Sequence, residues 1–137
     1  MNNPGNKISW RQLREFADVD LTKSFVLSWH VEAEALIVDV DLYLEPEHPF
    51  YERPRPAEKV CIRPAYLEFP YCEQLALAAS DPGEVPDIAK QIGHGAILDL
   101  CVPREGFYEI HGEFGTVSIA AERPLLRLDG PWHGSRS

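Results

Sequence analysis

The chain has 137 residues, of which 45% are hydrophobic and 26% are charged, and its formal net charge is -9. These values are typical of one soluble domain with a single core, so we expect one domain over residues 1–137, with loose tails at 1–7 and 130–137. The negative charge argues against nucleic acids and anionic membranes as partners, because both would repel the chain.

The sequence also lacks the usual signals of an exported or membrane protein. No stretch approaches the roughly 20 uncharged apolar residues that a membrane-spanning helix needs. The first residues have neither the basic nor the apolar region of a signal peptide, so we expect a cytoplasmic protein. The three cysteines, Cys61, Cys72 and Cys101, show no CxxC spacing and are interpreted as free, mostly buried thiols.

The first predicted element is a short amphipathic helix over residues 9–17. Trp10 and Phe16 belong to an apolar set at helical spacing, while Ser9 and Gln12 stand at the two positions of a capping box. We expect this helix to pack on one face of a sheet through its apolar side.

Two segments with period-two alternation, residues 24–32 and 35–44, predict an antiparallel hairpin. The expected inward side chains are Phe25, Leu27, Trp29 and Val31 in the first strand and Leu36, Val38, Val40, Leu42 and Leu44 in the second. A register shift of one residue would bury Asp39 and Asp41, so the register is strongly specified. The connecting pair Ala33-Glu34 is not a favoured pair for a two-residue turn, and a longer or bulged turn is the alternative.

A loop with restricted backbone freedom follows at residues 45–58, because its four prolines fix their own φ and bias the preceding residues toward extended conformations. Residues 60–69 predict a third strand beside the hairpin, and Pro64 within it indicates a bulge or a sheet edge. Residues 72–79 are ambiguous between a helical turn and a strand. Residues 86–93 are ambiguous between a helical turn and a loop.

The C-terminal part predicts a strand over residues 96–102 and a second hairpin over residues 107–111 and 114–121. Gly112 stands at the first position of a type II′ turn in this hairpin. The leucines at positions 125, 126 and 128 are expected to close the core. Together these elements predict an α+β fold: a mainly antiparallel, twisted sheet of about six strands with the short N-terminal helix packed on one face.

The charge is unevenly spread along the chain. Residues 24–52 contain seven acids and no lysine or arginine, whereas residues 53–63 contain four basic residues and one acid. Two interpretations are open. Either neighbouring surface groups compensate each other, at about 1 kcal/mol or less for each exposed pair, or the acidic hairpin steers a basic partner.

The candidate binding residues lie on the outward face of the second strand and in the loop that follows it. They are Asp39, Asp41, Glu45, Glu47, His48, Phe50, Tyr51 and Arg53. A small enzyme or a metal-dependent ligand-binding protein would use Asp39, Asp41, Glu47 and His48. Strand-face carboxylates at this spacing are usually solvated, however, and no HExxH, EF-hand, GxSxG or phosphate-loop motif is present. We therefore predict no catalytic residue, no metal and no cofactor.

The loop contains two adjacent aromatic residues, Phe50 and Tyr51. They either fold onto the core as a lid or form an exposed contact patch of the kind that binding interfaces use.

Several short motifs resemble a family of small uncharacterised bacterial proteins. They are Ser24-Phe25-Val26-Leu27-Ser28-Trp29, the His48-Pro49-x-Tyr51 piece after Leu44, Cys61, and Gly112-x-Phe114-Gly115. This resemblance covers residues 10–121 and implies no established activity, so no catalytic residue follows from it. More loosely, the chain is similar to the single-domain β-rich immunity proteins that neutralise toxins.

The leading functional hypothesis is a non-enzymatic protein-binding or regulatory module, immunity-like, that meets a basic protein partner through the acidic hairpin and the loop at residues 45–58. A small enzyme or metal-dependent ligand-binding protein is the first alternative. The second is a self-associating structural protein that forms homo-oligomers through an exposed strand edge.

Overall fold

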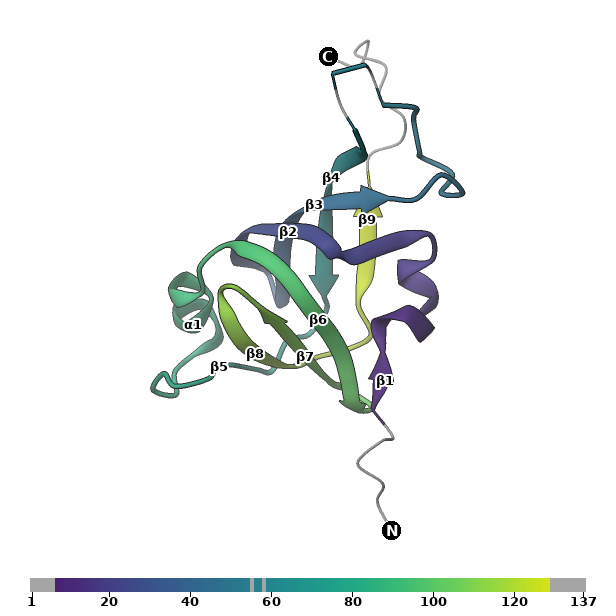
Figure 1. Cartoon of the computed structure of the whole chain (residues 1–137). Coiled ribbons are helices and arrows are strands. Elements are labelled where there is room, and N and C mark those ends of the chain that lie inside the picture. The colour runs from purple at the N-terminus through teal and green to yellow at the C-terminus, as the bar shows by residue number, and fades with distance from the viewer. Residues whose placement is uncertain (1–6, 55, 58, 129–137) are drawn as a thin grey trace.

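The computed structural model describes residues 7–54, 56–57 and 59–128 (Figure 1). Apart from residue 7, the two predicted tails lie outside these ranges. The strands are β1 (Ile8–Ser9), β2 (Val19–Glu32), β3 (Ala35–Leu44), β4 (Cys61–Phe69), β5 (Gln74–Leu77), β6 (Gly95–Arg104), β7 (Phe107–Gly112), β8 (Gly115–Ala120) and β9 (Leu125–Leu128). The helical elements are the 3-10 turns η2 (Trp10–Gln12) and η3 (Arg14–Phe16) and the helix α1 (Val85–Gln91). Within the described ranges, no helix has the length and apolarity required to cross a membrane.

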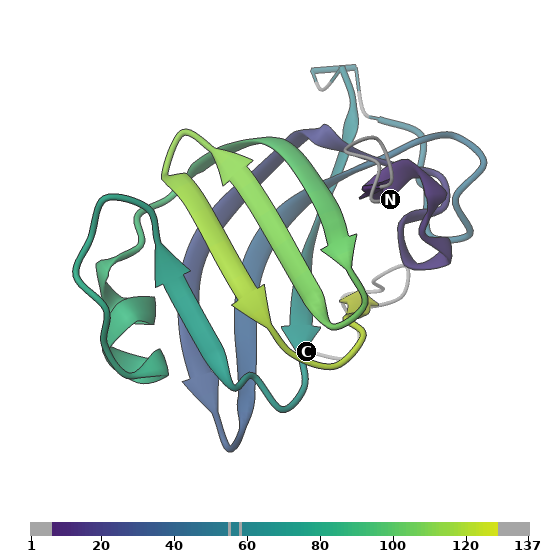
Figure 2. The same ribbon diagram turned by 90° about the horizontal axis from the view of Figure 1, so that it is seen from below.

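The nine strands of the described residues form one antiparallel sheet in the order β5-β8-β7-β6-β2-β3-β4-β9, with β1 paired to β6. The sheet folds back on itself, so that two layers face each other (Figure 2). We call β2, β3, β4 and β9 the first layer, and β5, β8, β7 and β6 the second layer. Only two residue pairs join β2 to β6, Phe25 with Ala96 and Val26 with Gly95. This narrow junction allows one side of each layer to face a common core.

The core fills the space between the two layers. Leu42 and Phe69 of the first layer and Ile97 of the second are almost fully buried, and each such side chain stabilises the fold by about 1.5–3 kcal/mol. The Phe69 ring meets the ring of Tyr108 from the opposite layer at a centroid distance of 5.4 Å. The helix α1 contacts β2 and β5 at one end of the layers, and the two 3-10 turns lie at the other end (Figure 2).

The predicted α+β fold with about six strands is wrong, because the described chain is almost entirely β structure. The predicted N-terminal helix is instead the pair of 3-10 turns. Its capping box forms, with the Ser9 amide donating to Gln12 Oε1 at 3.1 Å, but the first turn ends at Gln12, because the backbone of Leu13 is extended. A helix of so few residues has little stability of its own, so burial of Trp10 and Phe16 in the core decides the local backbone.

Three strands were not among those predicted, and all three are short. β1 has 2 residues, and β5 and β9 have 4 each. Runs of this length carry too little periodicity to be distinguished from other structure, and pairing with a neighbouring strand fixes them. The ambiguous segment at residues 72–79 contains β5, and the one at 86–93 belongs mostly to α1. Leu126 and Leu128 of β9 pack against the core as predicted, whereas Leu125 is exposed.

The strand β3 confirms the alternation predicted for the second strand of the first hairpin. Its buried inward side chains are Leu36, Val38, Val40, Leu42 and Leu44. Asp39 and Asp41 lie between them on the opposite face. The turn before β3 has two residues, Ala33 and Glu34, and Ala33 adopts a positive φ of 54°. The tight two-residue turn therefore forms even though Ala33-Glu34 is not a residue pair that such turns favour.

The strand β2 departs from its predicted alternation. It begins at Val19, and its pairing with β3 is interrupted by two register shifts, the second between Val26 and Ser28. A bulge adds one residue to a strand and turns the residues beyond it to the other face. Phe25 and Leu27, expected inside, are 37% and 45% exposed. The prediction for these two residues is wrong, and two large apolar side chains face outward.

The second hairpin forms as predicted, but its turn lies one residue later. Gly112 pairs with Gly115, so the turn residues are Glu113 and Phe114. Gly112 is required for close packing instead: a Cβ at this position would lie 2.6 Å from the carbonyl oxygen of Ala96 and against the Phe114 ring.

Candidate functional site

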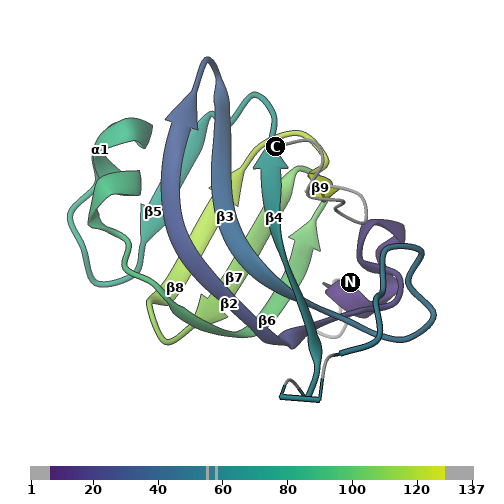
Figure 3. The same cartoon turned by 90° about the horizontal axis from the view of Figure 1, so that it is seen from above.

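Asp39 lies in the middle of β3 on the outer face of the first layer, the face toward the viewer in Figure 3. Ser28 of β2 donates a hydrogen bond from Oγ to Asp39 Oδ2 at 2.5 Å, and His30 Nδ1 lies 3.9 Å from the same oxygen. Asp39 Oδ1 is buried, and no described residue donates a hydrogen bond to it. A buried acceptor without a donor costs about 1–3 kcal/mol. The Asp39 carboxylate is therefore an incompletely matched negative group.

Ser28, His30 and Asp39 do not form the arrangement of a hydrolase. The serine hydroxyl donates directly to the aspartate, and His30 contacts the carboxylates of Asp39 and Glu32. A catalytic triad places the histidine between the serine and the carboxylate, where it can take the hydroxyl proton. In this group His30 is therefore not placed to take the proton of the Ser28 hydroxyl.

Exposed apolar side chains surround Asp39. Leu27 is 45% exposed and Tyr66 of β4 is 51% exposed. Together with Asp39 and Arg127 they line a hollow of about 240 Å³. We call this surface, with the neighbouring outward residues, the outer patch: Phe25, Leu27, Asp39, Asp41, Pro64 and Tyr66. The patch combines apolar contact area with negative charge.

The only basic side chain of the described chain within ion-pair distance of the outer patch's carboxylates is His30, which lies 3.9 Å from Asp39 Oδ2. Among the residues that the structure describes, no lysine or arginine lies within ion-pair distance of Asp39 or Asp41. Arg127 at the margin of the hollow pairs with Glu68, Nε to Oε1, at 2.9 Å. The internal compensation considered from the sequence does not extend to these two aspartates within the described chain.

Compensation does occur in the loop that follows β3. Arg63 Nη2 lies 2.5 Å from Glu52 Oε1, which joins the basic segment to the end of the acidic one. Arg53, a predicted binding residue, is exposed. Internal compensation is thus observed for Glu52, whereas the steering of a basic partner by the acidic hairpin stays a prediction.

The aromatic residues of the loop pack against the body of the protein. Phe50 and Tyr51 are partly buried and pack against the core, in keeping with a lid and not with an exposed contact patch. The Phe50 amide donates to His48 Nδ1 at 3.0 Å, and the Tyr51 amide donates to the His48 carbonyl oxygen at 3.0 Å. Burial lowers the pKa of His48 below its ordinary value of 6.5, although the charge of Asp18 opposes this shift. His48 therefore acts as a hydrogen-bond acceptor that orders the loop.

Two acids of the loop, Glu45 and Glu47, lie apart from those of β3. Glu45 and Glu47 form a group with Asp18 in which carboxylate oxygens lie within 4.8 Å of one another. Such oxygens suit a hard cation, but no second feature of the described chain marks a site there. Because Glu47 belongs to this group and Asp39 and Asp41 do not, the side chains of the enzyme alternative are not brought together.

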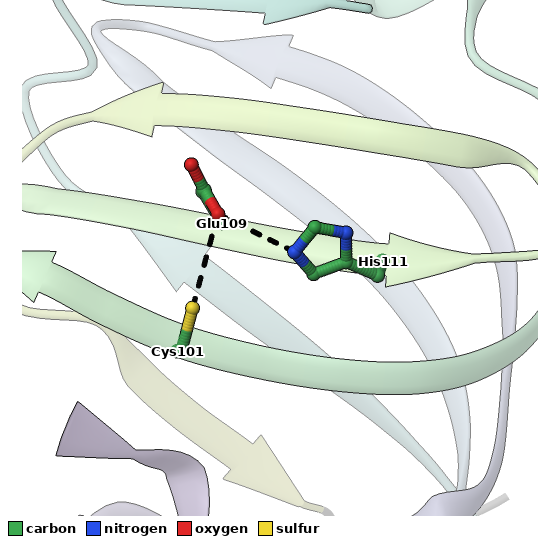
Figure 4. Close-up of side chains that lie close together, drawn as sticks. All are labelled: Cys101, Glu109 and His111. Atoms are coloured by element: carbon green, nitrogen blue, oxygen red, sulfur yellow. Dashed lines mark hydrogen bonds and ion pairs between the residues drawn. The ribbon is translucent and has the colours of Figure 1, made fainter. Parts of the chain in front are cut away.

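The outer face of the second layer holds a group of side chains that the sequence analysis did not find. Cys101 of β6 and Glu109 and His111 of β7 converge there (Figure 4). Glu109 Oε1 lies 3.9 Å from Cys101 Sγ and 3.3 Å from His111 Nε2. The signal available in the sequence was Glu109-x-His111, two ligand-type residues on one face of a predicted strand. The third member, Cys101, becomes visible only through cross-strand pairing.

The three cysteines are free, as predicted. Burial raises the pKa of the Cys72 thiol to about 11. Burial also raises the pKa of Cys101, and the charge of Glu109 adds to this effect. A protonated thiol is a poor nucleophile, so neither cysteine has the character of a reactive thiolate at neutral pH.

Comparison of the chain with protein-family models, with curated proteins and with solved structures gives no match. The family resemblance expected from the short motifs stays a prediction. Function is therefore argued from the geometry of the chain itself.

Proposed function

We propose that this protein is a non-enzymatic binding module that holds a basic protein partner against the outer patch. The observation that carries this proposal is the Asp39 carboxylate, which is flanked by the exposed side chains of Leu27 and Tyr66 and has no lysine or arginine partner among the described residues. A cytoplasmic location and an immunity-like role, in which the partner is a toxin, belong to this proposal as they did to the sequence-based hypothesis.

The chemistry of the patch specifies the partner. A lysine or arginine that enters the hollow would pair with the exposed part of the Asp39 carboxylate, and Asp41 would attract a second basic group. Leu27 and Tyr66 would bury apolar area, which contributes about 25 cal/mol for each Å² removed from water. Aromatic and arginine side chains supply most of the energy in many interfaces, and the net charge of -9 would steer a basic partner toward the protein.

Two observations support binding over the alternatives. The four side chains of the enzyme alternative fall into separate groups, since Glu47 lies with Asp18 and Glu45 while Asp39 lies with Ser28. For self-association through a strand edge, the terminal strands of the sheet, β5 and β9, have only 4 residues each, and short edge strands resist pairing with another sheet.

A peptide selection tests the proposal and does not require the partner to be identified first. Random peptides displayed on phage are selected on the immobilised protein and counted again on the double variant Asp39→Asn/Asp41→Asn. The variant Asp81→Asn/Glu84→Gln is the matched control, because it removes the same charge from exposed positions near α1. Circular dichroism and the thermal midpoint establish that each variant is folded.

We expect the selected peptides to combine lysine or arginine with apolar residues. Their binding should weaken about ten-fold or more on the Asp39/Asp41 variant, which corresponds to about 1.4 kcal/mol, and should be retained on the control. Equal binding to both variants would overturn the proposal, as would an acidic consensus. Sedimentation that shows a dimer dissociated by Leu27→Ser would replace the proposal with self-association through the outer patch.

A further inference from the structure

The group formed by Cys101, Glu109 and His111 lies on paired strands of the second layer (Figure 4). Cys101 and Glu109 are direct cross-strand partners in β6 and β7, and His111 is the next residue of β7 on the same face. Cys101 is buried, while the other two side chains are partly exposed. Side chains fixed on neighbouring strands are held more precisely than side chains on loops.

The spacing of the three donor atoms is close to that of a zinc coordination sphere. Glu109 Oε1 lies 3.9 Å from Cys101 Sγ and 3.3 Å from His111 Nε2, and all three donor atoms lie within 4.8 Å of one another. In tetrahedral zinc, with bonds of about 2.3 Å to sulfur and 2.0 Å to nitrogen or oxygen, the ligand atoms are about 3.3–3.5 Å apart. Small side-chain rotations would bring the three atoms onto one ion.

A neighbouring residue orients the histidine for this role. His111 Nδ1 lies 3.0 Å from Thr116 Oγ1 on β8, its cross-strand partner. When Nδ1 donates its proton to this hydroxyl, Nε2 carries the free lone pair and faces Glu109. Metal-binding histidines are commonly held in this way by a hydrogen bond from the other ring nitrogen.

The donor set also selects among metals. A thiolate, an imidazole and a carboxylate together suit Zn²⁺, whereas Mg²⁺ and Ca²⁺ prefer oxygen ligands alone. A bound divalent cation would dominate the local electrostatics and stabilise a thiolate at Cys101. Lys7 Nζ, 3.9 Å from Glu109 Oε1, is on an exposed side chain and would turn toward solvent.

We propose that Cys101, Glu109 and His111 form a zinc site with three protein ligands and a fourth position open to water or to a ligand from outside. Thr116 is the positioning residue of this site. The competing account is a polar cluster without metal, in which the thiol is hydrogen-bonded to Glu109 and Lys7 balances the charge. The proposal is independent of the partner expected at the outer patch.

Cobalt titration of the full-length, reduced and chelator-treated protein distinguishes these accounts. Cobalt(II) bound to a thiolate gives a near-ultraviolet charge-transfer band, and tetrahedral cobalt gives intense visible bands. We expect both spectra to saturate at a single equivalent and to disappear when zinc is added. Absence of the thiolate band from the wild-type protein at millimolar cobalt would overturn the proposal without need of any variant.

Variants then assign the ligands. Cys101→Ala should abolish the thiolate band and weaken metal binding at least ten-fold, whereas Cys72→Ala, the matched thiol control, should leave both unchanged. Thr116→Val preserves side-chain shape and should weaken binding about 10- to 100-fold with the band retained. A thiolate band that survives Cys101→Ala would place the metal elsewhere and overturn the proposal. The thermal midpoint of each metal-free variant establishes that it is folded.

Discussion

The outer faces of the two layers are built by the same alternation of strand residues, yet they present different chemistry. On the first layer, Leu27 and Tyr66 are exposed beside the carboxylate of Asp39. On the second layer, the buried Cys101 lies beside the partly exposed polar groups of Glu109 and His111. One face is apolar and acidic and suits a macromolecular contact. The other gathers soft and borderline donor atoms that suit a metal ion.

Irregular pairing explains much of this difference. A register shift in β2 between Val26 and Ser28 turns Leu27 outward. In β6, register shifts occur on both sides of the segment that contains Cys101, between Ile97 and Asp99 and between Cys101 and Arg104. Because each bulge resets which residues face outward, the positions of bulges determine the surface chemistry as strongly as the composition of the strands does.

The largest expected effect on the free energy of unfolding comes from comparing a substitution on the inner side of the first layer with one on its outer side. Leu42→Ala removes a fully buried side chain and should lower the free energy of unfolding by about 2–5 kcal/mol. Leu27→Ala on the outer patch should change it by about 0.5 kcal/mol or less. Urea unfolding measures both. A Leu27 variant as destabilised as the Leu42 variant would show that the outer patch is covered by the protein itself.

The next effect concerns the junction of the two layers, where Gly95 and Ala96 of β6 pair with β2. Gly112→Ala would press a Cβ against the Ala96 carbonyl, and we expect a loss of about 1–3 kcal/mol from overpacking. Gly93→Ala is the matched control, because a Cβ there would meet nothing within 4 Å. Equal stability of the two variants in urea unfolding would mean that the backbone at this junction shifts enough to accept the added Cβ without loss.

A pH effect tests whether the loop between β3 and β4 is a closed lid. The pKa of His48 is lowered in the folded protein by burial, so the unfolded chain binds the proton more readily. The associated stability is present above the unfolded pKa, near 6.5, and is lost as the pH falls through the folded pKa. In His48→Asn, whose amide oxygen can still accept from the Phe50 amide, stability should vary less with pH between 8 and 5. Identical profiles for the two proteins would show that His48 is not held in a buried position and that the loop is not a closed lid.

The smallest stability effect is expected at the margin of the hollow. Arg127→Ala breaks the exposed pair with Glu68 and should cost less than about 1 kcal/mol. Because it removes a positive charge beside Asp39, the variant should bind the selected basic peptides more tightly than the wild type does. Weaker peptide binding, measured by calorimetry, would indicate that Arg127 contacts an acidic group of the partner. The outer face of the first layer would then differ less from that of the second layer.

The sequence by itself determined the elements whose periodicity is long and unbroken. The alternation of β3 placed Leu36 to Leu44 inside and Asp39 and Asp41 outside, because a one-residue shift would bury two carboxylates. The second hairpin and the free state of the cysteines also followed from local pattern and composition. The predicted site residues on β3 were placed on the correct face for the same reason.

The tertiary structure decided the features that depend on pairing between distant segments. The side chains of Phe25 and Leu27 face outward because of a bulge in the pairing of β2 with β3. The 3-10 turns form because Trp10 and Phe16 are buried in the core. The convergence of Cys101 with Glu109 follows from a cross-strand register. None of these is encoded in the periodicity of one segment, because each is fixed by the free energy of contacts that form only when the layers come together.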